Sequence, residues 1–531
     1  MFDISTISLI LLIAMLVLLA IGMPLGFASA VLAVGVLFMK FGPDFLFGTF
    51  GTGPLNILAQ RVYGLLTDYV LISIPLFIFM ANLLERSGIA SEMYSSLNVW
   101  LSRTRGGIAI VTSIMAVIMA AMSGIIGGEV VLLGLIALPQ MLRLGYNQNL
   151  AIGVICASGS LGTMIPPSIV LIIYGLITET SIKALFTAAF LPGFMLACFF
   201  ILYIIIRTRM NPALAPLPPD DPADPQGGEK GLLFLTFLAT IGGGICAALA
   251  LRAGFFTVTG QNAAREGVDL ITLGTPGHAL GFAVAAALCL GLILFGFGRD
   301  RLRQSWAMGK GLVAPIIVIG VVLGSIYGGI TGITEAAGMG VVAVAVVAIL
   351  RGEMTGTLLW DSLKRTLKST GTIIWVTIGA TALAGAYTIA GGPTYIANMI
   401  VGLDMPAMGI IFVMMLIFLI LGALMDWVGI VLLVMPVFLP IVLKLPVADL
   451  GFVGELNPRH VAIWFGVVFC MNMQVSFLSP PFGPAAFYLK SVAPPHISLT
   501  DIFKGFLPFI VIQILALSVL LIWPPMVSLF L

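Results

Sequence analysis

The chain has 531 residues, of which 60% are hydrophobic and 9% are charged, and its net charge is only +2 at neutral pH. The mean hydropathy of +1.17 excludes a soluble globular protein, and the balanced charge gives no indication of a nucleic-acid partner. Because the alternation of a β-barrel is absent, the composition predicts an all-α polytopic protein of the lipid bilayer.

The N-terminal apolar run, residues 7–39, is too long for one upright membrane span, since about 33 residues at 1.5 Å each make roughly 50 Å. A glycine–proline break at 22–26 divides it into two short spans. Residues 312–350 are likewise a long apolar run with a glycine-rich break. Later elements of the second half follow those of the first half at a nearly constant residue offset. We therefore expect an internal duplication, in which residues 1–206 correspond to residues 311–531.

Residues 107–142 form an apolar stretch with basic residues on both sides and Ser123-Gly124 at its midpoint. Basic flanks are typical of the cytoplasmic side of a membrane, so both ends are predicted there. This predicts a re-entrant hairpin at about 106–143, with a span plus a surface helix as the alternative. Glu129 follows the tip and is expected either to hold a cation or to face the positive end of the returning half-helix.

A broken helix is predicted at about 147–178. Glycines allow the chain to unwind there, and the Pro166-Pro167 pair lacks the N–H groups that upstream carbonyls need. The freed carbonyls and the hydroxyls of Ser160 and Thr163 are hard oxygen ligands, which suit an alkali cation. For a single segment of this kind, a proline kink with close helix packing is an equal alternative.

Residues 207–310 are predicted as an insertion between the two halves. The stretch 211–230 is rich in Pro, Asp and Gly and is typical of a solvated linker. The apolar runs 232–251 and 279–297 predict two added membrane spans. An even number of added spans leaves the relative orientation of the two halves unchanged.

The second half repeats a hairpin at about 407–444 and a broken helix at about 460–489. Asp426 lies at the second predicted tip, and Pro480-Pro481 follow several polar residues in the second break. A carboxylate at membrane depth costs about 2.5–3.5 kcal/mol even on the lenient insertion scale, so Asp426 is expected to be paired, protonated or cation-bound. Paired breaks in two halves of a chain are typical of a transporter's binding site, and we therefore predict ion or substrate binding.

The basic residues predict the orientation. With five spans and a hairpin in each half, plus the two inserted spans, most of the 24 basic residues fall inside when both termini are periplasmic. The odd number of spans in the first half makes the second half inverted. Lys364, Arg365 and Lys368 are placed in an inside loop by this topology.

These motifs resemble the large membrane subunit of the tripartite ATP-independent periplasmic (TRAP) transporters, over nearly the whole chain apart from the insertion. The motifs are Ser123-Gly124, the glycine- and proline-rich stretch 159–168, Gly-Ile-Thr-Glu-Ala-Ala at 332–337, Asp426, and Ser-Pro-Pro-Phe-Gly at 479–483. The inserted spans and residues 473–483 are similar to the subgroup labelled for mannitol, chloroaromatic compounds and 2-oxoacids.

The resemblance implies an importer of the bacterial inner membrane, driven by a sodium gradient. It implies an elevator mechanism, in which a unit holding both hairpins slides against a scaffold. It also implies two protein partners: a small four-span membrane subunit and a periplasmic substrate-binding protein that delivers a small organic anion. Sodium is named through the resemblance, because Asp426 and Glu129 alone leave proton coupling open.

The resemblance also implies two sodium sites, one between each hairpin and its neighbouring broken helix, with the substrate between the tips. The implied sodium-binding residues are Ser123, Gly159, Ser160, Gly162, Met164, Gly422, Asp426, Asn472, Gln474 and Phe477. The implied substrate-binding residues are Ser123, Gly124, Gly128, Thr163, Asp426, Trp427 and Ser476. The first tip departs from the serine-rich family pattern at Ile125 and Ile126.

Other functions share part of this pattern. A self-sufficient, cation-coupled di- or tricarboxylate transporter of the divalent-anion class would have the same hairpins but need no binding protein. An ion channel would instead need an open pore. A membrane enzyme is the weakest alternative, because no nucleophile–base set and no transition-metal cluster is evident in the sequence.

Overall fold

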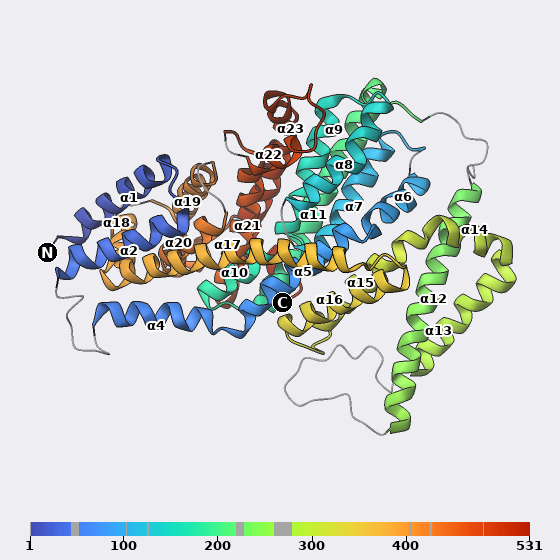
Figure 1. The fold of residues 1–531 in the computed structure, drawn as a ribbon, viewed down its shortest axis with the longest axis horizontal. Coiled ribbons are helices and arrows are strands. Elements are labelled where there is room, and N and C mark those ends of the chain that lie inside the picture. Colours follow the sequence, from blue (N-terminus) through green and yellow to red (C-terminus); the bar gives the residue numbers. More distant parts are fainter. Residues whose placement is uncertain are drawn as a thin grey trace.

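The computed structural model describes residues 2–43, 53–101, 103–124, 127–218, 228–259, 279–402, 405–423, 427–481 and 483–531. All regular elements in these ranges are helices, and nine helical segments among them are long and apolar enough to cross a membrane. Figure 1 shows an elongated body with the N-terminal helices at one end and the inserted helices at the other. The predicted all-α polytopic class is confirmed.

The first half opens with two short apolar helices separated at the glycine–proline break. Its opening helices are α1 (Ile4–Ala20), α2 (Leu25–Phe41), α4 (Pro54–Leu66), α5 (Ser73–Arg86) and α6 (Ile89–Leu101). The Asp3 carboxylate accepts a hydrogen bond from the Ser5 N–H and caps α1. A 3-10 helix, η1 (Tyr69–Ile72), joins α4 to α5.

A pair of short helices lies where the first hairpin is expected, and a broken helix follows it. These elements are α7 (Gly107–Ser123), α8 (Gly128–Arg143), α9 (Gln148–Gly159), the 3-10 turn η2 (Leu161–Thr163) and α10 (Ile169–Thr178). α7 and α8 have 17 and 16 residues. Each is therefore about 25 Å long, which is shorter than the hydrocarbon core of about 30 Å. The 29-residue helix α11 (Ile182–Met210) ends this half.

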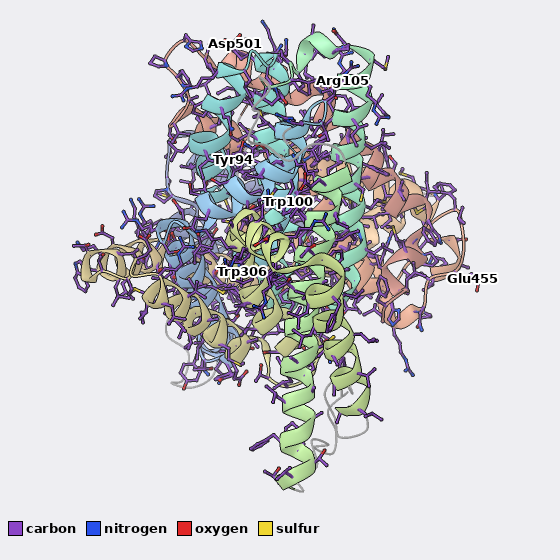
Figure 2. All side chains as sticks on the ribbon, turned by 90° about the vertical axis from the view of Figure 1, so that its right-hand side faces the viewer. Tyr94, Trp100, Arg105, Trp306, Glu455 and Asp501 are labelled. Atoms are coloured by element: carbon purple, nitrogen blue, oxygen red, sulfur yellow. The ribbon has the colours of Figure 1, made fainter. Side chains whose placement is uncertain are left out.

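The insertion contains a helical pair that extends beyond the rest of the body (Figure 2). Its elements are α12 (Gly228–Thr259), α13 (Ala279–Gly291), a π-helical turn (Leu292–Phe297) and α14 (Arg299–Gly309). At the base of the pair, the ring of Trp100 on α6 lies 5.3 Å from that of Phe234 on α12 and fixes the pair to the body. Within the insertion, the Ser305 hydroxyl on α14 donates to the Leu233 carbonyl on α12 at 2.9 Å.

The second half repeats the order of the first. Its main elements are α15 (Val313–Tyr327), α16 (Ile333–Leu350), α17 (Gly356–Ile389), α18 (Gly392–Val401), α19 (Ala407–Gly422), α20 (Trp427–Val442), α21 (Val461–Leu478), α22 (Pro484–Lys490) and α23 (Leu499–Ile522). One difference is that α17 is continuous, whereas its counterpart is divided into α4 and α5. The Thr355 side chain accepts from the Leu358 N–H and starts α17 early. Arg365 and Lys368 therefore lie on a helix, so their predicted placement in a loop was wrong.

Two groups of helices outside the insertion position the predicted sites. In the first, α7–α11 pack on α19–α23, and 94% of the α21 segment is buried. We call this group the hairpin unit. In the second, α2 and α5 pack on α17, and α16 packs on α5; we call these four helices the frame. Figure 1 shows α17 crossing the body, where it reaches α20 of the hairpin unit.

Candidate functional site

The end of α7, at the tip of the first hairpin, contacts the unwound segment of the broken helix. This segment comprises residues 160–168, between α9 and α10. Gly124 follows α7 with φ at +61°, a conformation that favours glycine. A Cβ atom at Gly124 would lie 2.1 Å from the carbonyl oxygen of Pro167. The Gly124 carbonyl in turn accepts from the Ile169 N–H at 3.4 Å. Both the backbone angle and the available space therefore require glycine at this tip.

Glu129 connects the tip to the unwound segment from the first turn of α8. Its side chain is 2% exposed, and the Ser123 hydroxyl donates to its Oε1 atom. A Cβ atom at Gly162 would lie 2.9 Å from the same Oε1 atom. The second oxygen, Oε2, is buried without a hydrogen-bond partner. The carboxylate thus lies between two predicted sodium-site residues, and it does not cap α8.

The unwound segment between α9 and α10 is held by short-range hydroxyl bonds. Ser160 Oγ donates to the Ala157 carbonyl at 2.8 Å, and Thr163 Oγ1 donates to the Ser160 carbonyl at 3.0 Å. Ser168 Oγ donates to the Thr163 carbonyl at 2.5 Å. Each hydroxyl uses its proton on a neighbouring carbonyl and also accepts one hydrogen bond, Ser160 Oγ from Gln513 Nε2 at 3.4 Å and Ser168 Oγ from the Leu171 N–H at 3.5 Å, so one lone pair of each oxygen is left.

The second hairpin meets the second broken helix by an equally close approach. A Cβ atom at Gly422 would lie 2.3 Å from both the Cβ and the Oγ atoms of Ser476 on α21. One turn earlier on α21, Asn472 Nδ2 donates to the carbonyl of Met415 on α19 at 3.0 Å. Asp426 lies outside the described residues, so its predicted sodium and substrate roles stay predictions.

A hydrogen bond joins the two broken helices next to the unwound segment of the first half. Gln474 Nε2 on α21 donates to Thr163 Oγ1 in the unwound segment of the first half. The side-chain oxygens of Gln474 and Asn472 are buried without a hydrogen-bond partner. With Glu129 Oε2, three unpartnered oxygen acceptors therefore lie on residues that contact the predicted sites.

The remaining residues of the predicted sodium and substrate sites differ in their burial and in what they contact. Gly159 faces α8, because a Cβ atom there would lie 2.6 Å from Val130, and this position serves helix packing. Met164 is fully buried, and Trp427 is partly buried at the start of α20. The ring of Phe477 stacks on that of Tyr488, with their centroids 6.3 Å apart.

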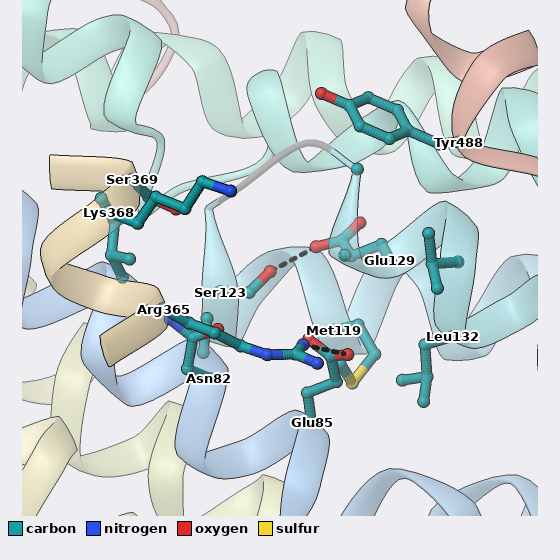
Figure 3. Close-up of a pocket in the computed structure, with 15 residues that line it drawn as sticks. Asn82, Glu85, Met119, Ser123, Glu129, Leu132, Arg365, Lys368, Ser369 and Tyr488 are labelled. Carbon is teal, nitrogen blue, oxygen red and sulfur yellow. Dashed lines mark hydrogen bonds and ion pairs between the residues drawn. The ribbon is translucent and has the colours of Figure 1, made fainter. Parts of the chain in front are cut away.

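A cavity of about 400 Å³ opens beside the first tip, between the hairpin unit and the frame (Figure 3). It is lined by Ile78, Ala81, Asn82, Glu85, Met119, Ser123, Gly127, Gly128, Glu129, Val131, Leu132, Arg365, Lys368, Ser369 and Tyr488. Three charged residues of this lining, Glu85, Arg365 and Lys368, were not predicted from the sequence as site residues. The spacing of Arg365, Lys368 and Ser369 at i, i+3 and i+4 would have placed them on one helix face, had α17 been recognised as continuous.

Comparison with known proteins gives a concordant result. A sequence profile of the family described as "Tripartite ATP-independent periplasmic transporter, DctM component" matches residues 12–526. The C4-dicarboxylate TRAP transporter large permease of Pseudomonas aeruginosa is 24% identical over 90% of both chains. The ectoine/5-hydroxyectoine large permease of Ruegeria pomeroyi is 27% identical over 87% of this chain and 85% of its own. The fold is similar to that of the YdaH transporter of Alcanivorax borkumensis, with a TM-score of 0.52, 15% identity, and 94% and 96% of the two chains covered.

Proposed function

From the premise that this chain belongs to the DctM family of tripartite ATP-independent periplasmic transporters, we propose that it imports a small organic anion together with sodium ions. Family membership makes it a multi-pass membrane permease subunit rather than an enzyme. The proposal adds the coupling ion, the class of substrate, the elevator mechanism and the identity of its partners.

The sodium part of the proposal is carried by the buried oxygens without partners. Leaving a buried acceptor unpaired costs about 1–3 kcal/mol, and more for a charged group. Glu129 Oε2, Asn472 Oδ1 and Gln474 Oε1 are three such atoms, all on residues that contact the unwound segments or the hairpins. An alkali cation accepts oxygen ligands of this kind and balances the Glu129 charge. Ser123, Glu129 and the 159–164 segment would hold one ion, and Asn472, Gln474 and the Gly422 region the other.

The anionic substrate is supported by the ends of two half-helices and by the relatives. α8 begins at Gly128 and α20 at Trp427, and the positive N-terminal end of a helix attracts carboxylates. The substrates named for the two relatives, C4-dicarboxylates and ectoine, both carry a carboxylate. Gly124, Gly128, Thr163, Trp427 and Ser476 are the proposed surroundings of the anion, with Asp426.

An elevator movement would carry the hairpin unit past the frame. The hairpin unit holds both tips and both broken helices, so an ion or anion bound there would travel with it. TRAP large permeases work with a small membrane subunit and a periplasmic binding protein. We propose a four-span small subunit, a bacterial inner-membrane location, and periplasmic N- and C-termini.

Uptake by liposomes that contain both membrane subunits and the binding protein tests the proposal. Labelled succinate and labelled ectoine serve as the carboxylate probes. An inward sodium gradient is expected to drive accumulation, whereas an inward proton gradient in potassium buffer is not. Accumulation that persists without sodium would refute sodium coupling. Accumulation without the binding protein would instead favour the self-sufficient divalent-anion class.

A further inference from the structure

A carboxylate of the frame reaches the first hairpin tip inside the 400 Å³ cavity (Figure 3). Glu85 on α5 lies with its Oε1 atom 3.6 Å from Nη1 of Arg365 on α17. Its other oxygen, Oε2, lies 3.4 Å from the position of a Cβ atom at Gly128, the first residue of α8. Glu85 thus connects a cation of the frame with the start of the returning half-helix.

The Glu85–Arg365 pair is loose and leaves hydrogen-bond donors to spare. The Arg365 side chain is 53% exposed. A guanidinium has five N–H donors, and a separation of 3.6 Å is too long for a hydrogen bond, so Glu85 does not use these donors. A neighbouring pair between the same two helices, Arg86–Asp361, is much tighter at 2.8 Å. Glu85 is half-buried, with 24% of its side chain exposed, but the 3.6 Å separation and the exposure of Arg365 keep the pair weak, at about 1 kcal/mol, so a competing anion can displace Glu85.

A second cation lines the same cavity. Lys368 lies one turn after Arg365, is exposed, and makes no ion pair with any residue that the structure describes. Asn82 and Ser369 add polar groups to the wall. Glu129, 2% exposed and with one oxygen unpartnered, borders the cavity from the hairpin side. An anion here would therefore meet two cations of the frame and lie next to the proposed sodium position.

We propose that this cavity is an anion subsite in which a carboxylate of the transported solute replaces Glu85 against Arg365 and Lys368. The inference rests on the proposed function, since it concerns where the transported anion meets the frame. Glu85 is the resident competitor: it occupies the cations when the solute is absent and limits the affinity of the solute when it is present. The determinants of anion binding then include residues of the frame as well as residues of the two tips.

The local charge of the cavity can be measured without knowing the natural solute. A Ser369→Cys variant places a thiol on the cavity wall, and its reaction rates with an anionic sulfonatoethyl and a cationic trimethylammonioethyl methanethiosulfonate are compared. The parent chain supplies the background rate of the native cysteines. Removing one charge within about a Debye length is expected to change the ratio of the two rates about two- to fivefold.

In the Ser369→Cys background, Glu85→Gln should raise the anionic-to-cationic rate ratio, and Arg365→Gln should lower it. Asp361→Asn is the matched control, because it removes a carboxylate from the other α5–α17 ion pair without altering the wall of the cavity. Its effect on the ratio should be smaller than that of Glu85→Gln. Equal effects of the two substitutions, or none from Glu85→Gln and Arg365→Gln, would overturn the proposal.

Acetate, the simplest carboxylate, tests binding itself. Sodium acetate should slow labelling by the anionic reagent more than sodium chloride at equal ionic strength, and Glu85→Gln should make acetate effective at a lower concentration. Equal protection by acetate and chloride would remove the subsite. Because labelling needs neither a gradient nor the partner proteins, this outcome can be told apart from a failure of sodium-driven uptake.

Discussion

Substitution of Gly162 by alanine tests the contact between Glu129 and the unwound segment. The new Cβ atom would lie 2.9 Å from Glu129 Oε1 and 3.2 Å from Oε2, where ordinary contacts are 3.4–4 Å. The backbone at Gly162 is not in the left-handed region, so the substitution brings a steric change and no conformational strain. The carboxylate must move by several tenths of an ångström, away from the unwound segment.

The expected magnitude follows from the bond that Glu129 would lose. A hydrogen bond to a charged group is worth about 1.5–3 kcal/mol, and about 1.4 kcal/mol corresponds to a tenfold change in an equilibrium constant. If the displaced carboxylate loses the Ser123 bond and its place beside the cation, sodium affinity should fall about ten- to a hundredfold. The chain should still fold, because only the end of one flexible side chain is displaced.

The assay is the unfolding temperature of the purified chain as sodium chloride replaces potassium chloride at constant ionic strength. A ligand that binds only the folded state raises this temperature as its concentration passes its dissociation constant. Gly162→Ala should move the sodium midpoint to a higher concentration. Gly324→Ala on α15, where a Cβ atom meets nothing within 4 Å, is the control and should leave the midpoint in place. An unchanged midpoint in Gly162→Ala would refute a role of Glu129 in sodium binding.

Four other substitutions extend this reasoning. Glu129→Gln keeps the side-chain shape but removes the charge, so the sodium-dependent rise in unfolding temperature should largely disappear; Ser123→Ala should give a smaller loss, and a full response in both variants would contradict the ligand assignment. Gly124→Ala combines a left-handed backbone with a Cβ atom 2.1 Å from the Pro167 carbonyl, and should lower stability by about 2–4 kcal/mol, measured as lost thermal stability in potassium buffer. Trp100→Ala removes the ring packing at the base of the insertion and should increase proteolysis of α12–α13 while sodium binding is retained.

The positions of the breaks were predictable because their causes are local in sequence. Proline removes a backbone donor and glycine permits unusual backbone angles wherever they occur, so the 159–168 stretch could be identified before any contact was known. The alternatives for Glu129 could not be separated in the same way. Its environment is decided by Ser123 and Gly162, which reach it only when the hairpin folds back on the broken helix.

The cationic wall of the cavity was not predicted, for a related reason. Clusters of basic residues are typical of cytoplasmic loops, and this rule placed Arg365 and Lys368 outside the membrane-spanning helices. The rule reports the side of the membrane but not whether the backbone is helical. A single cap, Thr355 bound to the Leu358 N–H, starts α17 early enough to bring both cations against the first hairpin.

The proposed cation and anion positions share the first turn of α8, and this has an energetic consequence. Gly128 meets Glu85 of the frame, while the next residue, Glu129, holds Ser123 at the tip. A cation bound at Glu129 neutralises the charge that would repel an arriving carboxylate, and a carboxylate at Arg365 favours the cation in turn. Because coupling between two binding equilibria is reciprocal, the factor by which sodium strengthens anion binding must equal the factor by which the anion strengthens sodium binding. Two adjacent residues at the start of one half-helix would then link the ion to the solute, with no need for a signal through the rest of the hairpin unit.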